Sequence, residues 1–488
     1  MRFTMIRVSQ LFLFAGSLIL LLTCCEQRKE NSQRTPNVVL ILIDDLNDWV
    51  RCMDGHPLVK TPNIDKLASM GVLFTNAHAQ TAICNPSRVS FMTGLYPSST
   101  GIYFNTGNIE DSPAASKGML MTGRFEKEGY NVIGAGKLYS QGDLKYMTNH
   151  AGRFGGFGPL PDEKLTKYEG HQLWDWGIYP EEDTLTPDFK VAEWAVNQLK
   201  SGLQEPFFLG VGFFRPHVPM YAPQKYFDLY PLDSIQIPQV NPQDLEDLSE
   251  YAINLTRLEH IEPSHEWIIE NNEWKHLVQA YLASISFVDT QVGKVLNALE
   301  GNQLEENTYI LLVSDHGFHL GEKQVWAKQT LWEESTRVPL IIAGPGIPSR
   351  EVCEKPVQLL DIYPTLLDLT ELEADDYLEG RSLRPLLVDS KAPWPYIARS
   401  SFGPGNYAIR SENFRYIKYL DGSEEFYDHT IDESEWNNLI GDLDYKEKIA
   451  WHRSFLPTTN GSPILGSGST GHKAYAASGA ILQSSVNK

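Results

Sequence analysis

The stretch "NVVLILIDD", residues 37–45, decides the fold class of this chain. Asn37–Ile43 is a continuous run dominated by β-branched residues and leucine, which is typical of a strand buried on both faces. Two aspartates, Asp44 and Asp45, end the run abruptly. A strand of this kind belongs in a sheet that helices cover on both sides, so the stretch predicts an α/β domain.

Three more apolar runs follow along the chain and are also predicted to be buried strands. They are "PFFLGVGFF" (206–214), "YILLVS" (309–314) and "PLIIAG" (339–344). Helical patterns lie between them, and the clearest has apolar residues at spacings of three and four. These residues are Leu277, Tyr281, Ile285, Phe287, Val288, Val292, Val295 and Leu296. Buried strands that alternate with helices indicate a large, mostly parallel sheet flanked by helices.

Ionisable side chains follow three of these runs. They are Asp44 and Asp45 after the first, Arg215 and His217 in "RPHVP" after the second, and Asp315 and His316 in "DHGFHLGE" after the third. Sites in parallel sheets form beyond the carboxyl ends of the strands. We therefore expect these side chains to form one site.

The carboxylates of this set predict a cation. Converging carboxylates repel one another, and hard oxygen ligands favour Ca²⁺ or Mg²⁺ over softer metals. For a lone aspartate pair after a strand, a helix cap or a solvated turn is the alternative. The second acidic strand end, at Asp315 and His316, favours the metal site.

Four basic residues, Arg88, Lys137, Arg215 and Lys328, could together form an anion pocket, although each alone is typical of a surface charge. The chain has 488 residues and a formal net charge of −21, which argues against a nucleic-acid binder. An anionic substrate would have to be attracted by such a local pocket against the global field. With 42% hydrophobic residues, the chain can bury a sizeable core.

The pattern of residue types changes near residue 393. The stretch "YAIRSENFRYIKYLDGSEEFYDH" (407–429) alternates aromatic and polar residues and contains a turn signal at Asp421-Gly422, so antiparallel hairpins are expected. We predict a catalytic domain over 36–392 and a smaller C-terminal α+β subdomain over 393–456. The rest, 457–488, is rich in Gly, Ser, Thr and Ala and is expected to be a flexible tail.

The N-terminus has the pattern of an export signal. Arg2 and Arg7 precede the apolar run Leu11–Leu22, which is too short to span a bilayer comfortably. Either Cys24 or Cys25 could become the lipidated first residue of a bacterial lipoprotein, and plain secretion is the alternative. We therefore expect a signal peptide over 1–25, a tether over 26–36, and a periplasmic or outer-membrane location. No later apolar run is long enough to cross a membrane.

Without the signal, the cysteines that remain are Cys52, Cys84 and Cys353, which do not make a disulfide framework. Whether Cys52 and Cys353 pair is left open. Cys84 lies before Pro86, Ser87 and Arg88, where a helix could begin. A thiolate at a helix N-terminus beside an arginine would be activated, so a cysteine nucleophile with His217 or His316 as its base is the first hypothesis. A buried structural cysteine is the alternative.

The order around Cys84 resembles a known signature. "CNPSR" (84–88) followed by "TGLYP" (93–97) is similar to the C-x-P-S-R motif and the following T-G of sulfatases. Other motifs follow in that family's order, over roughly residues 36–450. They are "TPNIDKLASMGVLFTNAHAQ" (61–80), "GKLYS" (136–140), "GFFRPHVP" (212–219), "SDHGFHLGEKQVWAK" (314–328), "QLLDIYPTLLDL" (358–369) and "LEGRSLRPLL" (378–387). Within the family, "GFFRPHVP", "SDHGFHLGEKQVWAK" and the spacing after "GK" are most similar to the iduronate-2-sulfatase branch, which includes bacterial enzymes.

The resemblance implies an alkaline-phosphatase-like fold and a formylglycine-dependent sulfatase. A maturing enzyme would oxidise Cys84 to Cα-formylglycine, whose hydrate is the nucleophile. Calcium, or magnesium, would bind to Asp44, Asp45, Asp315, His316 and residue 84. Arg88 would stabilise the formylglycine hydrate, Lys137 and Lys328 would contact the sulfate, and His217 would protonate the leaving group, alone or with Lys328.

One position departs from the pattern. The branch has a histidine three residues after the lysine of "GK", and this chain has Ser140. Serine is a poor base at neutral pH, so another group could substitute, turnover could be slow, or the enzyme could be degraded. His150, His319 and His78 are the candidates for substitution.

Three functions follow as hypotheses. The first is hydrolysis of sulfate esters on acidic sugars or polysaccharide fragments, in which Lys328 or Arg215 would bind a uronate carboxylate. The second is a phosphoesterase or phosphonate hydrolase of the same superfamily, because sulfate and phosphate are both tetrahedral oxyanions. The third is a surface lipoprotein that binds sulfated glycans without turnover. The sugar itself would be chosen by the loops at 103–125, 140–185 and 225–270, where aromatic residues suit either sugar stacking or core packing.

Overall fold

The computed structural model describes residues 34–105, 107–140, 143–147, 149–258 and 261–464. The expected signal peptide, most of the tether, and residues 465–488 of the expected tail lie outside these residues. The compact unit that holds most of the described residues begins at Asn37, with the run that opened the sequence analysis. None of the described helices is both long enough and apolar enough to cross a membrane.

The main sheet has eight strands in the order β10-β2-β8-β7-β1-β5-β3, with β9 paired to β2 outside this order. The strands are β1 (Asn37–Asp44), β2 (Val72–His78), β3 (Asn131–Gly136), β5 (Phe207–Pro216), β7 (Thr308–Ser314), β8 (Arg337–Ala343), β9 (Glu351–Cys353) and β10 (Val357–Gln358). The central strands β7, β1, β5 and β3 are mutually parallel. The predicted fold class, a large mixed and mostly parallel sheet with helices, is confirmed.

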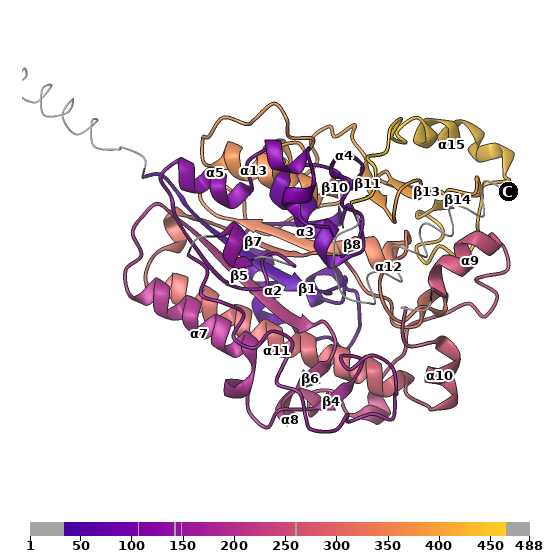
Figure 1. The fold of residues 1–488 in the computed structure, drawn as a ribbon, viewed down its shortest axis with the longest axis horizontal. Coiled ribbons are helices and arrows are strands. Elements are labelled where there is room, and N and C mark those ends of the chain that lie inside the picture. The colour runs from indigo at the N-terminus through magenta and orange to yellow at the C-terminus, as the bar shows by residue number, and fades with distance from the viewer. Residues whose placement is uncertain (1–33, 106, 141–142, 148, 259–260, 465–488) are drawn as a thin grey trace, which may run out of the picture. The chain divides into compact units, whose positions relative to one another are not determined.

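Strand β1 packs against helices on both of its faces, as its unbroken apolar sequence predicts. Val39, Ile41 and Ile43 belong to one core cluster with residues of α7 (Pro187–Lys200) and α11 (Trp274–Gly301). Val38, Leu40 and Leu42 belong to a second cluster with residues of α3 (Cys84–Thr93), α5 (Met121–Lys127) and α13 (Ile362–Leu369). The two sets of helices cover opposite faces of the sheet (Figure 1). The helix predicted from Leu277 onward is α11.

Strand β8 is the predicted run at 339–344, and it runs antiparallel to β7. The chain leaves β7 at the edge where the ionisable groups lie and enters β8 at the same edge, without a long helix that would carry it back. Parallel neighbours need such a crossover, so these two strands are antiparallel. Strand β3 was not among the predicted strands. Its sequence "NVIGAG" contains two glycines, which are poor strand formers.

A second sheet lies in the C-terminal region, where antiparallel hairpins were predicted. Its four strands are β11 (Ala398–Ser401), β12 (Tyr407–Arg410), β13 (Phe414–Lys418) and β14 (Glu424–Asp428). Each neighbouring pair is antiparallel. Gly422, in the predicted turn between β13 and β14, has a φ of 97°. The exact bounds of the two predicted domains stay a prediction.

Shorter elements complete the compact unit that begins at Asn37. The remaining helices are α2 (Pro62–Met70), α4 (Pro97–Thr100), α6 (Asp143–Tyr146), α8 (Gln224–Phe227), α9 (Glu250–Thr256), α10 (His265–Glu270), α12 (Glu333–Thr336), α14 (Arg384–Val388) and α15 (Lys446–Arg453). Strands β4 (Trp176–Ile178) and β6 (Met220–Ala222) form a small sheet of their own. Trp176, in an aromatic loop stretch that suits sugar stacking as well as core packing, is buried in the core.

The start of the C-terminal tail and the two remaining cysteines can also be compared with the sequence-based expectations. Gly461 and Ile464 donate main-chain hydrogen bonds to Ser98 and Gly101, so the start of the expected flexible tail packs against the domain. Cys52 and Cys353, whose pairing the sequence left open, are both free cysteines.

Candidate active site

The carboxyl ends of four parallel strands meet at one edge of the main sheet and deliver the ionisable groups there. Asp44 and Asp45 end β1, Asp315 and His316 follow β7, and His217 follows β5. Lys137 follows the unpredicted strand β3. Asp44, Asp45, Asp315 and His316 are fully buried. The structure therefore brings together the groups that the sequence placed at separate strand ends.

The two aspartates can face the same site because the strand ends irregularly. Successive side chains of a regular strand point to opposite faces. Here the pairing of β1 with β5 shifts register between Ile43 and Asp44, and Asp45 has a φ of 62°. A left-handed backbone is unusual for any residue other than glycine, but aspartate tolerates it better than most.

Lys137 is placed by a close approach of two backbones. Gly136, just before it, has a φ of 83°. A Cβ at this position would lie 1.8 Å from the carbonyl oxygen of Gly212 on β5. Only glycine fits there, and the turn that follows directs the chain into the site.

Cys84 is the first residue of α3 and lies at the centre of the cluster. Its Sγ is 3.3 Å from His316 Nε2, 3.4 Å from Lys328 Nζ and 3.9 Å from Asp45 Oδ1. The helix begins two residues before the start suggested by Pro86. It is fixed to β7 through Ser87, whose hydroxyl donates to the Asp315 carbonyl at 2.5 Å.

Arg88, fully buried one turn into α3, joins three strand ends. Its Nε donates to Asp315 Oδ2 at 2.8 Å and its Nη2 to Asp44 Oδ1 at 2.9 Å. Its Nη1 donates to the carbonyls of Lys137 and Leu138, the latter at 3.3 Å. The guanidinium thus holds the two acids and the loop after β3 in one arrangement.

Two lysines cover the carboxylates. Lys137 Nζ donates to both oxygens of Asp44, at 2.7 and 2.5 Å. Lys328 Nζ donates to Asp45 Oδ1 at 2.5 Å, and this lysine comes from the long loop between β7 and β8. Lys328 Nζ thus lies beside residue 84, and Lys137 Nζ lies on Asp44, whose ligand atom is within 4.8 Å of that of Cys84, so both ammonium groups can bind an anion there.

The two histidines present a fixed nitrogen to the cluster. His316 Nδ1 donates to the Gly317 carbonyl at 3.0 Å, and His217 Nδ1 donates to the Val218 carbonyl at 2.5 Å. The other nitrogen, Nε2, faces Cys84 in His316 and lies 3.9 Å from Asp45 Oδ2 in His217. Burial lowers the pKa of both rings, so each is neutral and presents a lone pair at Nε2.

The two neighbouring aspartates differ in their electrostatics. Burial by itself raises the pKa of Asp44, but the charges of Lys137 and Arg88 outweigh it and hold this pKa well below its usual range. At Asp45 burial outweighs Lys328 and His316 and raises the pKa to about 7. Lys328 therefore offsets only part of the cost of burying Asp45, whose Oδ2 is buried without a hydrogen-bond partner.

These observations fit a hard divalent cation. The ligand atoms of Asp44, Asp45, Cys84 and His217 lie within 4.8 Å of one another, as do those of Cys84, Asp315 and His316. Three of these six side chains are carboxylates, whose oxygens Ca²⁺ and Mg²⁺ prefer. The unpartnered oxygen of Asp45 and the lone pair of His316 both point to such an ion.

The hypothesis of an activated thiolate is not favoured. Burial raises the pKa of the Cys84 thiol, and the charges of Lys137 and Lys328 only partly offset this. A thiol with a raised pKa is a poor nucleophile at neutral pH. The unmodified cysteine is therefore not the reactive form that this site favours.

Arg215 lies outside the cluster. Its Nε donates to the Tyr221 carbonyl at 3.1 Å and its Nη2 to the Phe157 carbonyl at 3.2 Å, while Nη1 lies 3.5 Å from the His217 carbonyl oxygen. The guanidinium thus shapes the loop that carries His217. Its role in binding substrate stays a prediction.

Ser140 and the candidate histidines are spread out. Ser140 lines a cavity of about 10 Å³ together with Arg88. His78 bonds to Asn76 Oδ1 at 2.7 Å, and His319 bonds to Thr330 Oγ1 at 2.8 Å. His150 accepts from the Gly152 amide at 3.0 Å. None of these bonds involves Cys84, so they do not identify a replacement for the missing histidine.

Sequence reasoning missed two residues beside the site. Phe157 stacks on His217 with ring centroids 4.4 Å apart, and Lys137 Nζ lies 5.1 Å from the centre of the same ring. Tyr281, on α11, donates to the Asp45 carbonyl at 2.7 Å and accepts from the Asn47 amide at 2.9 Å. The helical spacing assigned Tyr281 only to the apolar face of a helix. No sequence pattern identified Phe157, because it lies in an irregular loop.

Comparison with known proteins assigns the chain to a family. The family model described as "Sulfatase" matches residues 36–372, and the model "N-sulphoglucosamine sulphohydrolase, C-terminal" matches residues 321–456. A protein named sulfatase from Formosa agariphila is 41% identical over 469 residues, with 92% of each chain covered. Human iduronate 2-sulfatase is 31% identical over 452 residues, covering 82% of this chain and 80% of the human protein.

Solved structures share the fold. A 2-O GAG sulfatase matches with a TM-score of 0.68 at 24% identity, covering 86% of this chain and 90% of the other. A phosphonate monoester hydrolase from Silicibacter pomeroyi matches with a TM-score of 0.69 at 23% identity, covering 86% of this chain and 94% of the other. At this identity the matches establish the fold alone. The family models and the closer relatives carry the assignment: this chain belongs to the sulfatase family and is a sulfuric ester hydrolase.

Proposed function

We propose that the protein hydrolyses sulfate esters on acidic sugars of a polysaccharide, with 2-O-sulfated uronates as the substrate class. The observation that carries the proposal is the convergence of Lys137 and Lys328 beside Cys84, within a chain of net charge −21. Buried ammonium groups in an acidic protein form the local positive pocket that a sulfate needs. The similarity to human iduronate 2-sulfatase supports the choice of sugar.

Two groups would complete the site. A maturing enzyme would convert Cys84 to Cα-formylglycine, and the hydrated aldehyde would supply the nucleophilic oxygen. Asp44, Asp45, Asp315, His316 and residue 84 would hold Ca²⁺, or Mg²⁺ in its place, and the ion would supply positive charge that polarises the sulfate. Both groups are inferred from the family and from the donor set at this site.

The side chains of the chain itself divide the remaining work. Lys137 and Lys328 would bind the sulfate oxygens, and Arg88 would keep Asp44 and Asp315 in place beneath them. Burial opposes the charge of Lys328, but Asp45 outweighs it and raises the lysine pKa, so the side chain stays charged and holds a proton for the leaving alkoxide. Neutral His217, with a lone pair at Nε2, would take up the proton that the attacking hydroxyl of the formylglycine hydrate releases.

The location is part of the proposal. The N-terminal pattern of Arg2, Arg7 and Leu11–Leu22 supports export, with lipidation at Cys24 or Cys25. An exported enzyme would meet polysaccharide fragments outside the cytoplasm.

Peptide mass spectrometry across residue 84, on protein purified from its own host, tests the maturation. The proposal expects formylglycine in place of cysteine. Sulfate release from a 2-O-sulfated uronate disaccharide by the same preparation tests the activity, and the Cys84→Ala variant should release none.

A matched phosphate or phosphonate monoester separates the second hypothesis from the first. Faster turnover of the phosphorus ester would favour a phosphoesterase or phosphonate hydrolase. An unmodified thiol in folded, exported protein that binds sulfated glycans but releases no sulfate would favour the inert glycan-binding lipoprotein. Either result would overturn the proposed function.

A further inference from the structure

The loop that carries Lys328 has no regular structure of its own. Residues 325–332 lie between a short 3-10 turn, Glu322–Gln324, and helix α12. Gln329, next to Lys328, has a φ of 79°. A lysine side chain has several rotatable bonds, so the position of its ammonium group depends on how firmly its backbone is held. The contacts that fix this loop therefore decide where Lys328 Nζ lies.

The C-terminal sheet provides the apolar support of the loop. Val325, Leu331 and Trp332 share one buried cluster with Ile417 of β13 and Tyr427 of β14. Ile83, the residue just before Cys84, belongs to the same cluster. One sheet thus packs against two of the segments that deliver side chains to the site, the start of α3 and the loop that carries Lys328.

Arg415 of β13 provides a polar anchor closer to Lys328. It is fully buried, and its Nη1 donates to the carbonyl of Leu331 at 2.8 Å, three residues beyond Lys328. Its Nη2 donates to the Glu333 carboxylate, and also to Thr336 Oγ1 at 3.1 Å. Arg410, directly across on β12, donates to the same carboxylate at 3.1 Å. A planar guanidinium can make all of these bonds at once, which an ammonium group cannot.

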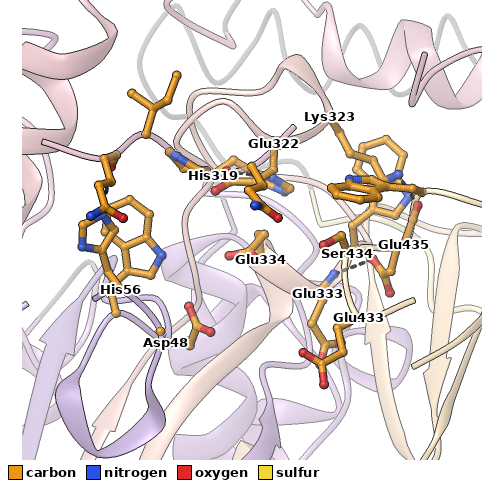
Figure 2. Close-up of a pocket in the computed structure, with 18 of the residues that line it drawn as sticks. Asp48, His56, His319, Glu322, Lys323, Glu333, Glu334, Glu433, Ser434 and Glu435 are labelled. Atoms are coloured by element: carbon orange, nitrogen blue, oxygen red, sulfur yellow. Dashed lines mark hydrogen bonds and ion pairs between the residues drawn. The ribbon is translucent and has the colours of Figure 1, made fainter. Parts of the chain in front are cut away.

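Further bonds tie the two ends of the loop to the C-terminal region. Trp332 Nε1 donates to Glu425 Oε2 at 2.9 Å, and the Glu333 amide donates to Glu435 Oε2 at 2.9 Å. Lys323, Trp332, Glu333 and Glu435 line a cavity of about 360 Å³, in which Glu333 and Glu435 lie side by side (Figure 2). Polar bonds therefore hold this part of the loop in addition to the apolar contacts of Trp332.

From these contacts we infer that Arg415 is a positioning residue of the hydrolysis. It acts on the reaction through Lys328, by holding the Leu331 carbonyl and Glu333, with the Trp332–Glu425 bond as a second anchor. The inference rests on the proposed function, because it assigns the C-terminal sheet a part in placing a group that contacts sulfate.

The test is a double-mutant cycle with Arg415→Lys and Lys328→Ala. Arg415→Lys keeps the buried charge, but an ammonium group cannot bond to the Leu331 carbonyl, the Glu333 carboxylate and Thr336 in the same geometry. We therefore expect kcat for the sulfated disaccharide to fall by about tenfold to a hundredfold with little change in KM. In the Lys328→Ala background the same substitution should lower kcat no further, since a residue that acts through Lys328 has nothing left to position.

Arg453→Lys is the matched control. Arg453 of α15 pairs with Glu424 at 2.8 Å on an exposed part of the same region, with 49% of its side chain exposed. Its substitution should leave kcat unchanged. Hydrogen exchange gives a readout that does not depend on activity: peptides covering 325–336 should exchange faster in Arg415→Lys than in the wild type and the Arg453→Lys control, while α11 should stay protected.

The possible outcomes decide the inference. An equal loss of kcat in both backgrounds, or unchanged exchange over 325–336, would overturn it. If Arg415→Lys does not fold, Trp332→Phe removes the second anchor and enters the same cycle with the same criteria. A wild-type protein that releases no sulfate would contradict the proposed function instead, and the exchange result alone would then decide whether Arg415 holds the loop.

Discussion

The ammonium group of Lys137 lies 2.5 Å from Asp44 Oδ2. Removing this charge should lower the rate of hydrolysis more than it lowers the stability of the fold. The Lys137→Met variant keeps an apolar side chain of similar length but loses the charge that faces both Asp44 oxygens and the Phe157 ring. Removing one group that stabilises charge in a transition state costs about 100-fold to 1,000-fold in kcat. We expect a loss of this size in steady-state sulfate release.

Lys145→Met is the control for this prediction. Lys145 pairs with Glu110 at 2.6 Å on the surface, with 63% of its side chain exposed. Its substitution should leave kcat within the error of the assay. Equal activities of Lys137→Met and the wild type would contradict the assignment of Lys137 to the sulfate pocket.

Helix α2 begins without a cap from its own sequence and depends on α11 for one. Thr61 makes no capping bond. Asp289 of α11 instead accepts from the Ile64 amide at 2.8 Å and the Asn63 amide at 3.1 Å. Asp289→Ala leaves these buried donors unpaired, so we expect the free energy of unfolding to fall by about 2 kcal/mol. Urea unfolding followed by tryptophan fluorescence measures it.

A surface pair between the same two helices gives the comparison. Lys66 and Glu300 lie 2.7 Å apart, with 42% and 63% of their side chains exposed. Glu300→Ala should change the free energy of unfolding by less than about 0.5 kcal/mol. If the two variants were equally stable, the capping role of Asp289 would be wrong.

Helix α15 carries a pH-dependent contact with the C-terminal sheet. His452 is buried, its Nδ1 donates to the Lys448 carbonyl at 2.7 Å, and its Nε2 lies 2.9 Å from Ser411 Oγ. Burial lowers the pKa of His452 from 6.5 to about 4. Between these values the unfolded chain binds a proton that the folded protein does not, so stability falls as the pH drops from 6.5 to 4, by at most about 3 kcal/mol.

Thermal unfolding at pH 7, 5.5 and 4.5 measures this contribution. His452→Gln should lose less stability on acidification than the wild type, because it has no ring to protonate. His276→Gln, at an exposed position on α11, is the control and should follow the wild type. Parallel acid profiles for all three proteins would rule out His452 as a source of the acid sensitivity.

The proposed cation site joins segments that are far apart in the sequence. Removal of the cation should therefore lower the stability of the fold as well as the activity. Asp44, Asp45 and Asp315 are fully buried and come from two strands of the main sheet. Dialysis against EGTA and EDTA should abolish sulfate release and lower the melting temperature, and Ca²⁺ should restore both. An ion at a hundred times its dissociation constant stabilises the folded state by about 2.7 kcal/mol. A chelated protein with unchanged melting temperature and activity would contradict the metal site.

The sequence predicted the central fold because burial on two faces has a plain signature. The runs at 37–43, 206–214 and 309–314 all proved to be parallel neighbours. Strand β3 was not predicted because it contains two glycines, of which Gly136 serves a close backbone approach that no local pattern reveals. The antiparallel direction of β8 was not predicted either, because it depends on the sheet edge to which the preceding loop returns.

Local sequence thus determined the fold class, the family resemblance and the residue types of the site, since buried runs, sharp strand ends and short motifs are written in neighbouring residues. The distances between those groups, the neutral state of the two histidines and the raised pKa of the Cys84 thiol depend on burial and on charges from remote segments. The bond from Arg415 to the Leu331 carbonyl spans 84 residues of sequence. Such a contact exists only once the C-terminal sheet has packed against the loop, because no spacing along the chain encodes which side chains will meet there.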